Sequence, residues 1–98
     1  MQFHFTGKNF DITDALAIFA TEKLSVLEHR DHHIQDIHVT LAVEHTNQIA
    51  EATLHLPGAK LHAKAETDDM YKSIKELSEK LVAQVTKHKD KGFEDRRS

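Results

Sequence analysis

Four side chains near the end of the chain have the types and spacing to bind a phosphate backbone. The stretch KLVAQVTKHKDK contains Lys80, Gln84, Lys87 and Lys91, the last three lying 4, 7 and 11 residues after the first. On a helix these spacings place the four within about 60° of one another as one basic ridge, while Lys89 points elsewhere. Cations arranged in this way favour nucleic acid, because each neutralised phosphate releases a condensed counterion. The alternative is that the lysines only complement the negative end of the helix dipole.

A fifth candidate, Lys23, lies inside the apolar stripe of an earlier predicted helix. That stripe consists of Leu16, Phe19, Ala20 and Leu27. A charged side chain in such a position must extend to the rim of the core. If the two helices lie side by side on a sheet, Lys23 emerges in the groove between them, beside the basic ridge. We therefore predict a cationic groove; the alternative is an ordinary lysine whose stem covers the core margin.

The overall charge argues against a nucleic-acid partner, but the distribution of charge does not. The whole chain carries 13 basic and 16 acidic residues, a net charge of −3. Residues 1–85 hold 8 basic and 13 acidic residues, whereas residues 86–98 hold 5 basic and 3 acidic ones. The local field, and not the sum, decides which partner is attracted.

The nine histidines raise the question of a metal site. His4, His38, His55 and His62 are all predicted on the outward face of a sheet, where a zinc site is conceivable. No cysteine pair and no HExxH spacing supports it, so we expect solvent-facing or stacking histidines and no metal or other cofactor.

No pattern of an enzyme is present. The carboxylates form no recognisable acid–base pair with a nucleophile, and the sequence has no glycine-rich phosphate loop and no GxSxG. Tyr71 could stack on a base, or its ring could pack at the core margin.

Apolar periodicity predicts the elements that position these residues. Residues 2–5 and the alternating stretches 37–43, 51–56 and 61–66 are typical of strands, with turns around Asn47 and at Pro57-Gly58. Helical spacing predicts one helix over about 13–29, capped by Thr13, and another from a cap at Thr67 or Asp68 to about residue 91, where Gly92 ends it.

This element order predicts an α+β fold of β-α-β-β-β-α type. We expect a two-layer sandwich in which both helices cover one face of a four-stranded mixed sheet. The helix between the first two strands permits a parallel crossover, and the later strands are expected to form antiparallel hairpins. We expect a single domain over residues 1–91 and a flexible tail over residues 92–98.

Length and composition narrow the class of protein further. Ninety-eight residues suit one modest core, and no apolar run approaches the roughly 18 residues that would span a bilayer. The N-terminus shows no secretion signal and the chain has no cysteine, so we expect a cytoplasmic protein.

Three segments resemble the short form of the bacterial ribosome hibernation promoting factor family, which includes the ribosome-associated inhibitor or protein Y. They are ITDAL, ATLHLPGAKLHAKAE and DDMYKSIKELSEKLVAQVTKHKDK, and the resemblance covers residues 1 to about 91. It implies a non-enzymatic cytoplasmic protein with a fold similar to a double-stranded RNA-binding domain. Such proteins bind the small ribosomal subunit in the tRNA and mRNA channel and inactivate ribosomes in stationary phase. The RNA-binding residues implied here are Lys23, Lys80, Gln84, Lys87, Lys89 and Lys91.

The resemblance also implies partners. These are the small ribosomal subunit with its ribosomal RNA and, by analogy, a separate ribosome modulation factor that promotes inactive ribosome dimers; off the ribosome we expect a monomer. The chain length favours the hibernation factor over the longer-tailed inhibitor, which opposes dimers. Glu76 and Glu79 near the basic ridge suggest lower or more salt-sensitive affinity.

Three alternatives stay open at this point. One is a protein-binding stress regulator that uses the exposed sheet face, and another is a metal-binding stress protein. A generic double-stranded RNA binder is the weakest, because its last helix would begin with basic residues, whereas Glu66, Asp68 and Asp69 stand here.

Overall fold

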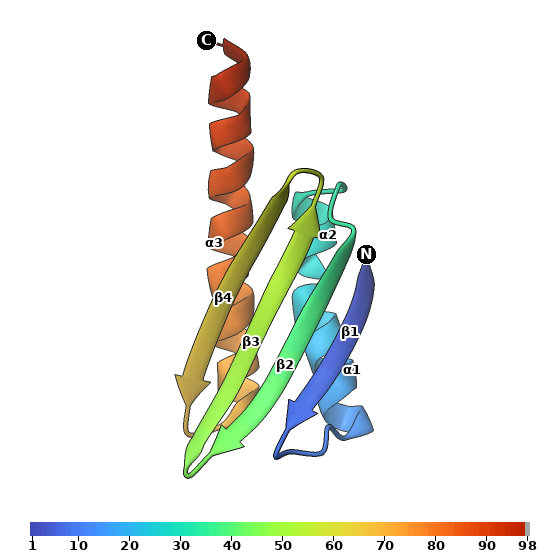
Figure 1. Ribbon diagram of the computed structural model, residues 1–98, viewed down its shortest axis with the longest axis vertical. Helices are drawn as coiled ribbons and strands as arrows, with labels where there is room; N and C mark the ends of the chain where they lie inside the picture. The colour runs from blue at the N-terminus through green and yellow to red at the C-terminus, as the bar shows by residue number, and fades with distance from the viewer. Residues whose placement is uncertain (98) are drawn as a thin grey trace.

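The computed structural model describes the backbone of residues 1–97 and the side chains of residues 1–89. Figure 1 shows a sheet with all helices behind one of its faces, as predicted. The elements in chain order are β1 (Gln2–Lys8), α1 (Asp14–Leu24), α2 (Val26–Arg30), β2 (Asp36–Glu44), β3 (Asn47–Leu56), β4 (Ala59–Thr67) and α3 (Met70–Arg97).

The sheet has the strand order β1-β2-β3-β4. β1 pairs with β2 in parallel, and the β2–β3 and β3–β4 pairs are antiparallel, which confirms the predicted mixed sheet. Alternation explains its two faces: along β2, Ile37, Val39 and Leu41 are buried, while His38 between them is exposed. The outward face is therefore polar and the inward face receives the helices.

Two tight turns join the antiparallel strands. The β2–β3 turn consists of His45 and Thr46, with φ of 56° at His45, so the turn predicted around Asn47 lies one to two residues too late in the sequence. Gly58 has φ of 74° and supplies the positive φ predicted for the β3–β4 turn.

The first helical segment is interrupted, contrary to the single helix predicted over residues 13–29. Its start is as predicted, because the Thr13 hydroxyl accepts a hydrogen bond from the Leu16 N–H. α1 ends at Leu24: the Ser25 N–H makes its last helical bond, to the Thr21 carbonyl, and the Ser25 hydroxyl donates to the same carbonyl. The next backbone bond, from Glu28 to Ser25, spans only three residues, so α2 begins on a tighter turn.

The last helix begins later and runs further than predicted. The Asp69 carboxylate accepts from the N–H groups of Tyr71 and Lys72, so Asp69 caps α3 and neither Thr67 nor Asp68 does. α3 continues to Arg97, so the prediction that Gly92 ends it is wrong. The proposed flexible tail of residues 92–98 involves side chains outside the described range and stays a prediction.

The core lies between the sheet and the helices, and Leu27 of α2 belongs to it. The apolar stripe predicted along α3 is buried against β3 and β4, and α1 contacts α3 within the helix layer. The buried residues of α3 are Met70, Ile74, Leu77, Leu81 and Val85. Over residues 1–97, no helix combines the length and apolar character needed to cross a membrane.

Candidate nucleic-acid interface

The basic ridge of α3 lies against β4. The Lys80 ammonium donates to the Lys64 carbonyl at 2.7 Å, and the Gln84 amide donates to the His62 carbonyl at 2.6 Å. Lys87 is exposed and follows on the same side of the helix. We call Lys80, Gln84 and Lys87 the β4-side strip.

A second group of cations lies where α3 meets α1 and α2. The Lys23 ammonium lies 5.5 Å from the centroid of the Phe19 ring, at cation–π distance. Lys89 reaches from α3 to α2, where its ammonium donates to the Arg30 carbonyl at 2.6 Å. We call Lys23 and Lys89 the α1-side strip.

The predicted single groove that unites Lys23 with the basic ridge is therefore wrong. α1 meets α3 at Ser78, whose hydroxyl donates to the Lys23 carbonyl at 3.1 Å. Two residues further along the helix, Lys80 lies about 200° around the axis from Ser78. Lys23 does reach the surface, on the flank of α3 that also carries Lys89 and away from Lys80. The side chains of Lys80 and Gln84 reach a strand, not the neighbouring helix as predicted.

The remaining predicted residues occupy distinct positions. The side chain of Lys91 lies outside the described residues, so its place in the ridge stays a prediction. Glu76 and Glu79 are exposed on the solvent side of α3, about 160° and 100° from Ser78, and lie between the two strips around the helix. The helix layer thus presents two basic strips, and the exposed side of α3 between them carries Lys72 and Lys75 as well as the two glutamates.

Lys80, Lys89 and Lys23 are held by uncharged groups, two backbone carbonyls and an aromatic ring. Within residues 1–89, neither strip forms an ion pair with a carboxylate; the pairs made by lysines are Lys64 with Glu66 and Lys72 with Asp68. A lysine ammonium has three donors. Lys80 and Lys89 each use one donor on a backbone carbonyl, which leaves two for another acceptor such as a phosphate oxygen.

Tyr71 lies beside the α1-side strip. Its ring packs on Phe19 in a T-shaped arrangement with centroids 4.8 Å apart, and 46% of the residue is exposed. The inner part of the Tyr71 ring is therefore packed at the core margin. Its exposed part leaves room for base stacking, which stays a prediction.

The outward sheet face carries the four histidines predicted there. His4, His38 and His62 are exposed and His55 is half-buried. His62 lies 3.0 Å from the Glu51 carboxylate, and His55 forms a hydrogen bond with Asp36. This face lies opposite the helices and shares no residue with either basic strip.

The family model described as "Sigma 54 modulation protein / S30EA ribosomal protein" matches residues 3–92. A ribosome hibernation promoting factor of Klebsiella oxytoca is 47% identical over 91 residues, covering 93% of this chain and 96% of that protein. The proteins of the same name from Escherichia coli K12 and Azotobacter vinelandii are 46% and 44% identical, over 93% and 96% of this chain and 96% and 88% of theirs.

Solved structures agree with the fold. A ribosomal subunit interface protein of Coxiella burnetii superposes with a TM-score of 0.88 at 34% identity, over 92% of this chain and 99% of that one. The N-terminal domain of Thermus thermophilus Protein Y gives a TM-score of 0.84 at 27% identity, over 90% and 99%. Both comparisons confirm the β-α-β-β-β-α architecture predicted above.

Proposed function

Because this chain belongs to the Sigma 54 modulation protein / S30EA ribosomal protein family, we propose that it is a ribosome hibernation factor that silences translation in stationary phase. Relatives named ribosome hibernation promoting factor match this chain over nearly their whole length. We infer further that it binds the small ribosomal subunit in the channel that tRNA and mRNA use. This site of action is the one that the family resemblance in the sequence implies.

The RNA-binding part of this proposal rests on one observation: contacts within the protein hold three of the cationic side chains in place. Lys80 and Lys89 are anchored by backbone carbonyls, and Lys23 lies over an aromatic ring. Anchored side chains lose less conformational freedom when they meet a phosphate than freely moving lysines would. Gln84, Lys87 and, from the sequence, Lys91 extend the surface along α3.

The two strips suggest contact with two separate backbone segments. Since α3 lies between the strips, phosphates on one side would meet Lys80 and Lys87, while phosphates on the other side would meet Lys23 and Lys89. Between the strips, Glu76 and Glu79 are offset by Lys72 and Lys75, so the exposed face of α3 adds no net attraction for RNA. Inhibition then follows from occupancy: a folded domain held in the channel excludes tRNA and mRNA, and no chemical step is required. We accordingly infer no enzymatic activity.

The remaining parts of the proposal concern partners and location. We propose that the protein acts in the cytoplasm, is a monomer off the ribosome, and promotes inactive ribosome dimers in concert with a ribosome modulation factor. No membrane partner is proposed.

A gradient profile of starved cells with and without this protein tests the function. We expect the protein in the small-subunit, 70S or dimer fractions, and loss of ribosome dimers together with premature translational activity when it is deleted. Purified small subunits test the site, since excess tRNA and mRNA should displace the protein. A protein that stays in the soluble fraction of starved cells, or that binds subunits alongside tRNA and mRNA, would overturn the proposal.

A further inference from the structure

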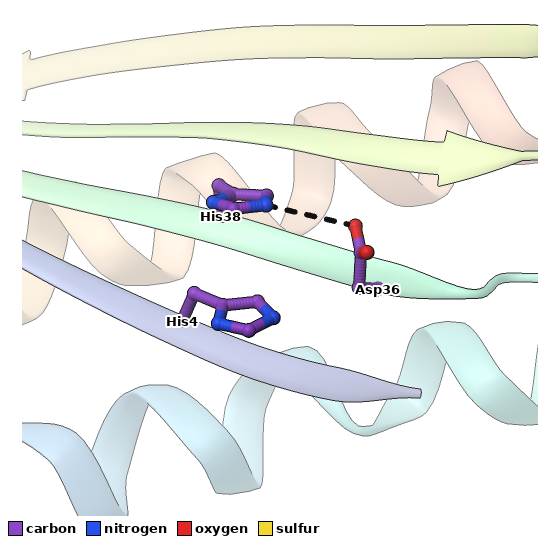
Figure 2. Close-up of side chains that lie close together, drawn as sticks. All are labelled: His4, Asp36 and His38. Atoms are coloured by element: carbon purple, nitrogen blue, oxygen red, sulfur yellow. Dashed lines mark ion pairs between the residues drawn. The ribbon is translucent and has the colours of Figure 1, made fainter.

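Three potential metal ligands converge on the outward face of the sheet. They are His4 on β1 and Asp36 and His38 on β2, and their ligand atoms all lie within 4.8 Å of one another (Figure 2). The parallel register explains the arrangement, because His4 lies directly beside His38 and Asp36 is two residues before His38. Residues two apart on a strand share a face, so all three side chains project to the same side.

Neighbouring contacts already orient the three side chains. The rings of His4 and His38 are stacked with centroids 4.6 Å apart and planes 16° from parallel. His38 Nε2 lies 3.8 Å from Asp36 Oδ1. On the next strand, His55 pairs with Asp36 in the register and its Nδ1 bonds to the same oxygen. Asp36 Oδ2 is not involved in these contacts, so the second carboxylate oxygen can serve as a ligand.

We propose that His4, Asp36 and His38 form a binding site for one divalent transition-metal ion, for which Zn²⁺ is the expected occupant. Two imidazoles and one carboxylate are ligands that suit Zn²⁺, whereas Mg²⁺ and Ca²⁺ prefer oxygen atoms alone. His55 is the outer partner that fixes the ligating carboxylate. The fourth position faces solvent and would hold water.

The geometry requires only a small adjustment. Around a tetrahedral zinc ion with bonds of about 2.0–2.1 Å, ligand atoms lie about 3.3 Å apart. The separations here reach at most 4.8 Å. Rotation of the imidazole rings about χ2, a torsion with broad preferences, can close this difference without moving the strands.

On sequence spacing alone, no metal site was expected. That expectation relied on the absence of a cysteine pair and of an HExxH helix, which are patterns of ligands close together in the chain. Here His4 is brought to Asp36 and His38 by strand pairing. The site lies on the opposite face from the basic strips, so it does not depend on the proposed ribosome binding.

Titration of the full-length protein with Zn²⁺, by calorimetry and by competition with a chromogenic chelator, tests the site. We expect one tightly bound ion per chain. His4→Ala and His38→Ala should each lower the affinity by more than about 100-fold, and His55→Ala by about 10- to 100-fold, the usual cost of losing an outer partner. Co²⁺ should give the visible absorption of a low-coordinate site, which the double variant His4→Ala/His38→Ala should lack.

His62→Ala is the matched control. His62 is an exposed histidine on the same face with its own carboxylate neighbour, Glu51, so its loss should leave Zn²⁺ affinity unchanged. Should an alanine variant fail to fold, as judged by circular dichroism without metal, the corresponding glutamine variant replaces it. Unchanged affinity in folded His4 and His38 variants, or binding that occurs only when two chains associate in sedimentation, would overturn the proposal.

Discussion

Replacing three anchored lysines by glutamine is expected to remove three of five proposed phosphate contacts. The variant combines Lys23→Gln, Lys80→Gln and Lys89→Gln. These are the cations for which contacts fix the ammonium position, on a ring or on a backbone carbonyl. Lys87 and Lys91 are the other two proposed contacts. Glutamine removes the charge and keeps a donor, so the fold should be unaffected.

The expected salt dependence of the binding affinity follows from counterion release. Each neutralised phosphate adds about 0.7 to 0.9 to the slope of log affinity against log salt, so five contacts give a slope of about −3.5 to −4.5 and two give about −1.4 to −1.8. Between about 50 and about 200 mM salt, the affinity of the unsubstituted chain should fall roughly 130- to 500-fold, and that of the variant roughly 7- to 12-fold. This difference is far larger than the error of a binding assay.

The assay is equilibrium binding to purified small ribosomal subunits at several concentrations of potassium chloride. Lys8→Gln is the matched control, since Lys8 is an exposed lysine at the end of β1, the strand at the opposite edge of the sheet from β4. Its slope should equal that of the unsubstituted chain. If the triple variant also kept the full slope, the assignment of these lysines as phosphate contacts would be refuted.

Three further predictions concern the elements that position the strips, and each is measured by urea unfolding. Ser73→Ala should lower the free energy of unfolding by about 1–3 kcal/mol, because the fully buried hydroxyl donates to the Gln48 carbonyl at 2.6 Å; an unchanged midpoint would contradict this. Asp69→Ala should cost about 0.5–2 kcal/mol through loss of the α3 cap, and a neutral result would mean that another residue caps the helix. Gly7→Ala should cost about 1–3 kcal/mol, because the added Cβ would lie 2.1 Å from the Phe10 carbonyl oxygen and force the backbone to move; full stability would show that the β1–α1 connection yields easily.

Two of these predictions have close controls. Asp68→Ala removes the neighbouring carboxylate, which makes only an exposed pair with Lys72 at 3.5 Å, and should cost no more than about 0.5 kcal/mol. Gly58→Ala introduces a Cβ with no atom within 4 Å, so any loss there reflects the positive φ alone.

The fold was predictable from the sequence because its patterns are local. Alternation along β2 distinguishes the buried Val39 from the exposed His38, and the same rule identifies β3 and β4. The break at Ser25 was not predictable in this way. The Ser25 hydroxyl shares the Thr21 carbonyl with the Ser25 N–H, and many serines within helices do the same without a break.

The arrangement of the candidate site depends on information that the sequence does not carry locally. A helical wheel correctly groups Lys80, Gln84 and Lys87, but it does not say which flank of α3 meets α1. Ser78 offered a signal, since a small polar residue beside an apolar stripe allows close approach of another backbone. Likewise, alternation places His4 and His38 on one face, but only the strand register makes them neighbours.

The hydrogen bonds from α3 to β4 have a consequence for self-association. β4 ends the strand order, so within residues 1–97 no further strand occupies its outer side, and unpaired carbonyls along such a margin can recruit a strand from another molecule. Lys80 and Gln84 occupy two of these carbonyls and place a charge beside them, which discourages sheet extension between copies. A ligand that drew both side chains away would expose this margin, so the same two residues would link anion binding to the tendency of the chain to aggregate.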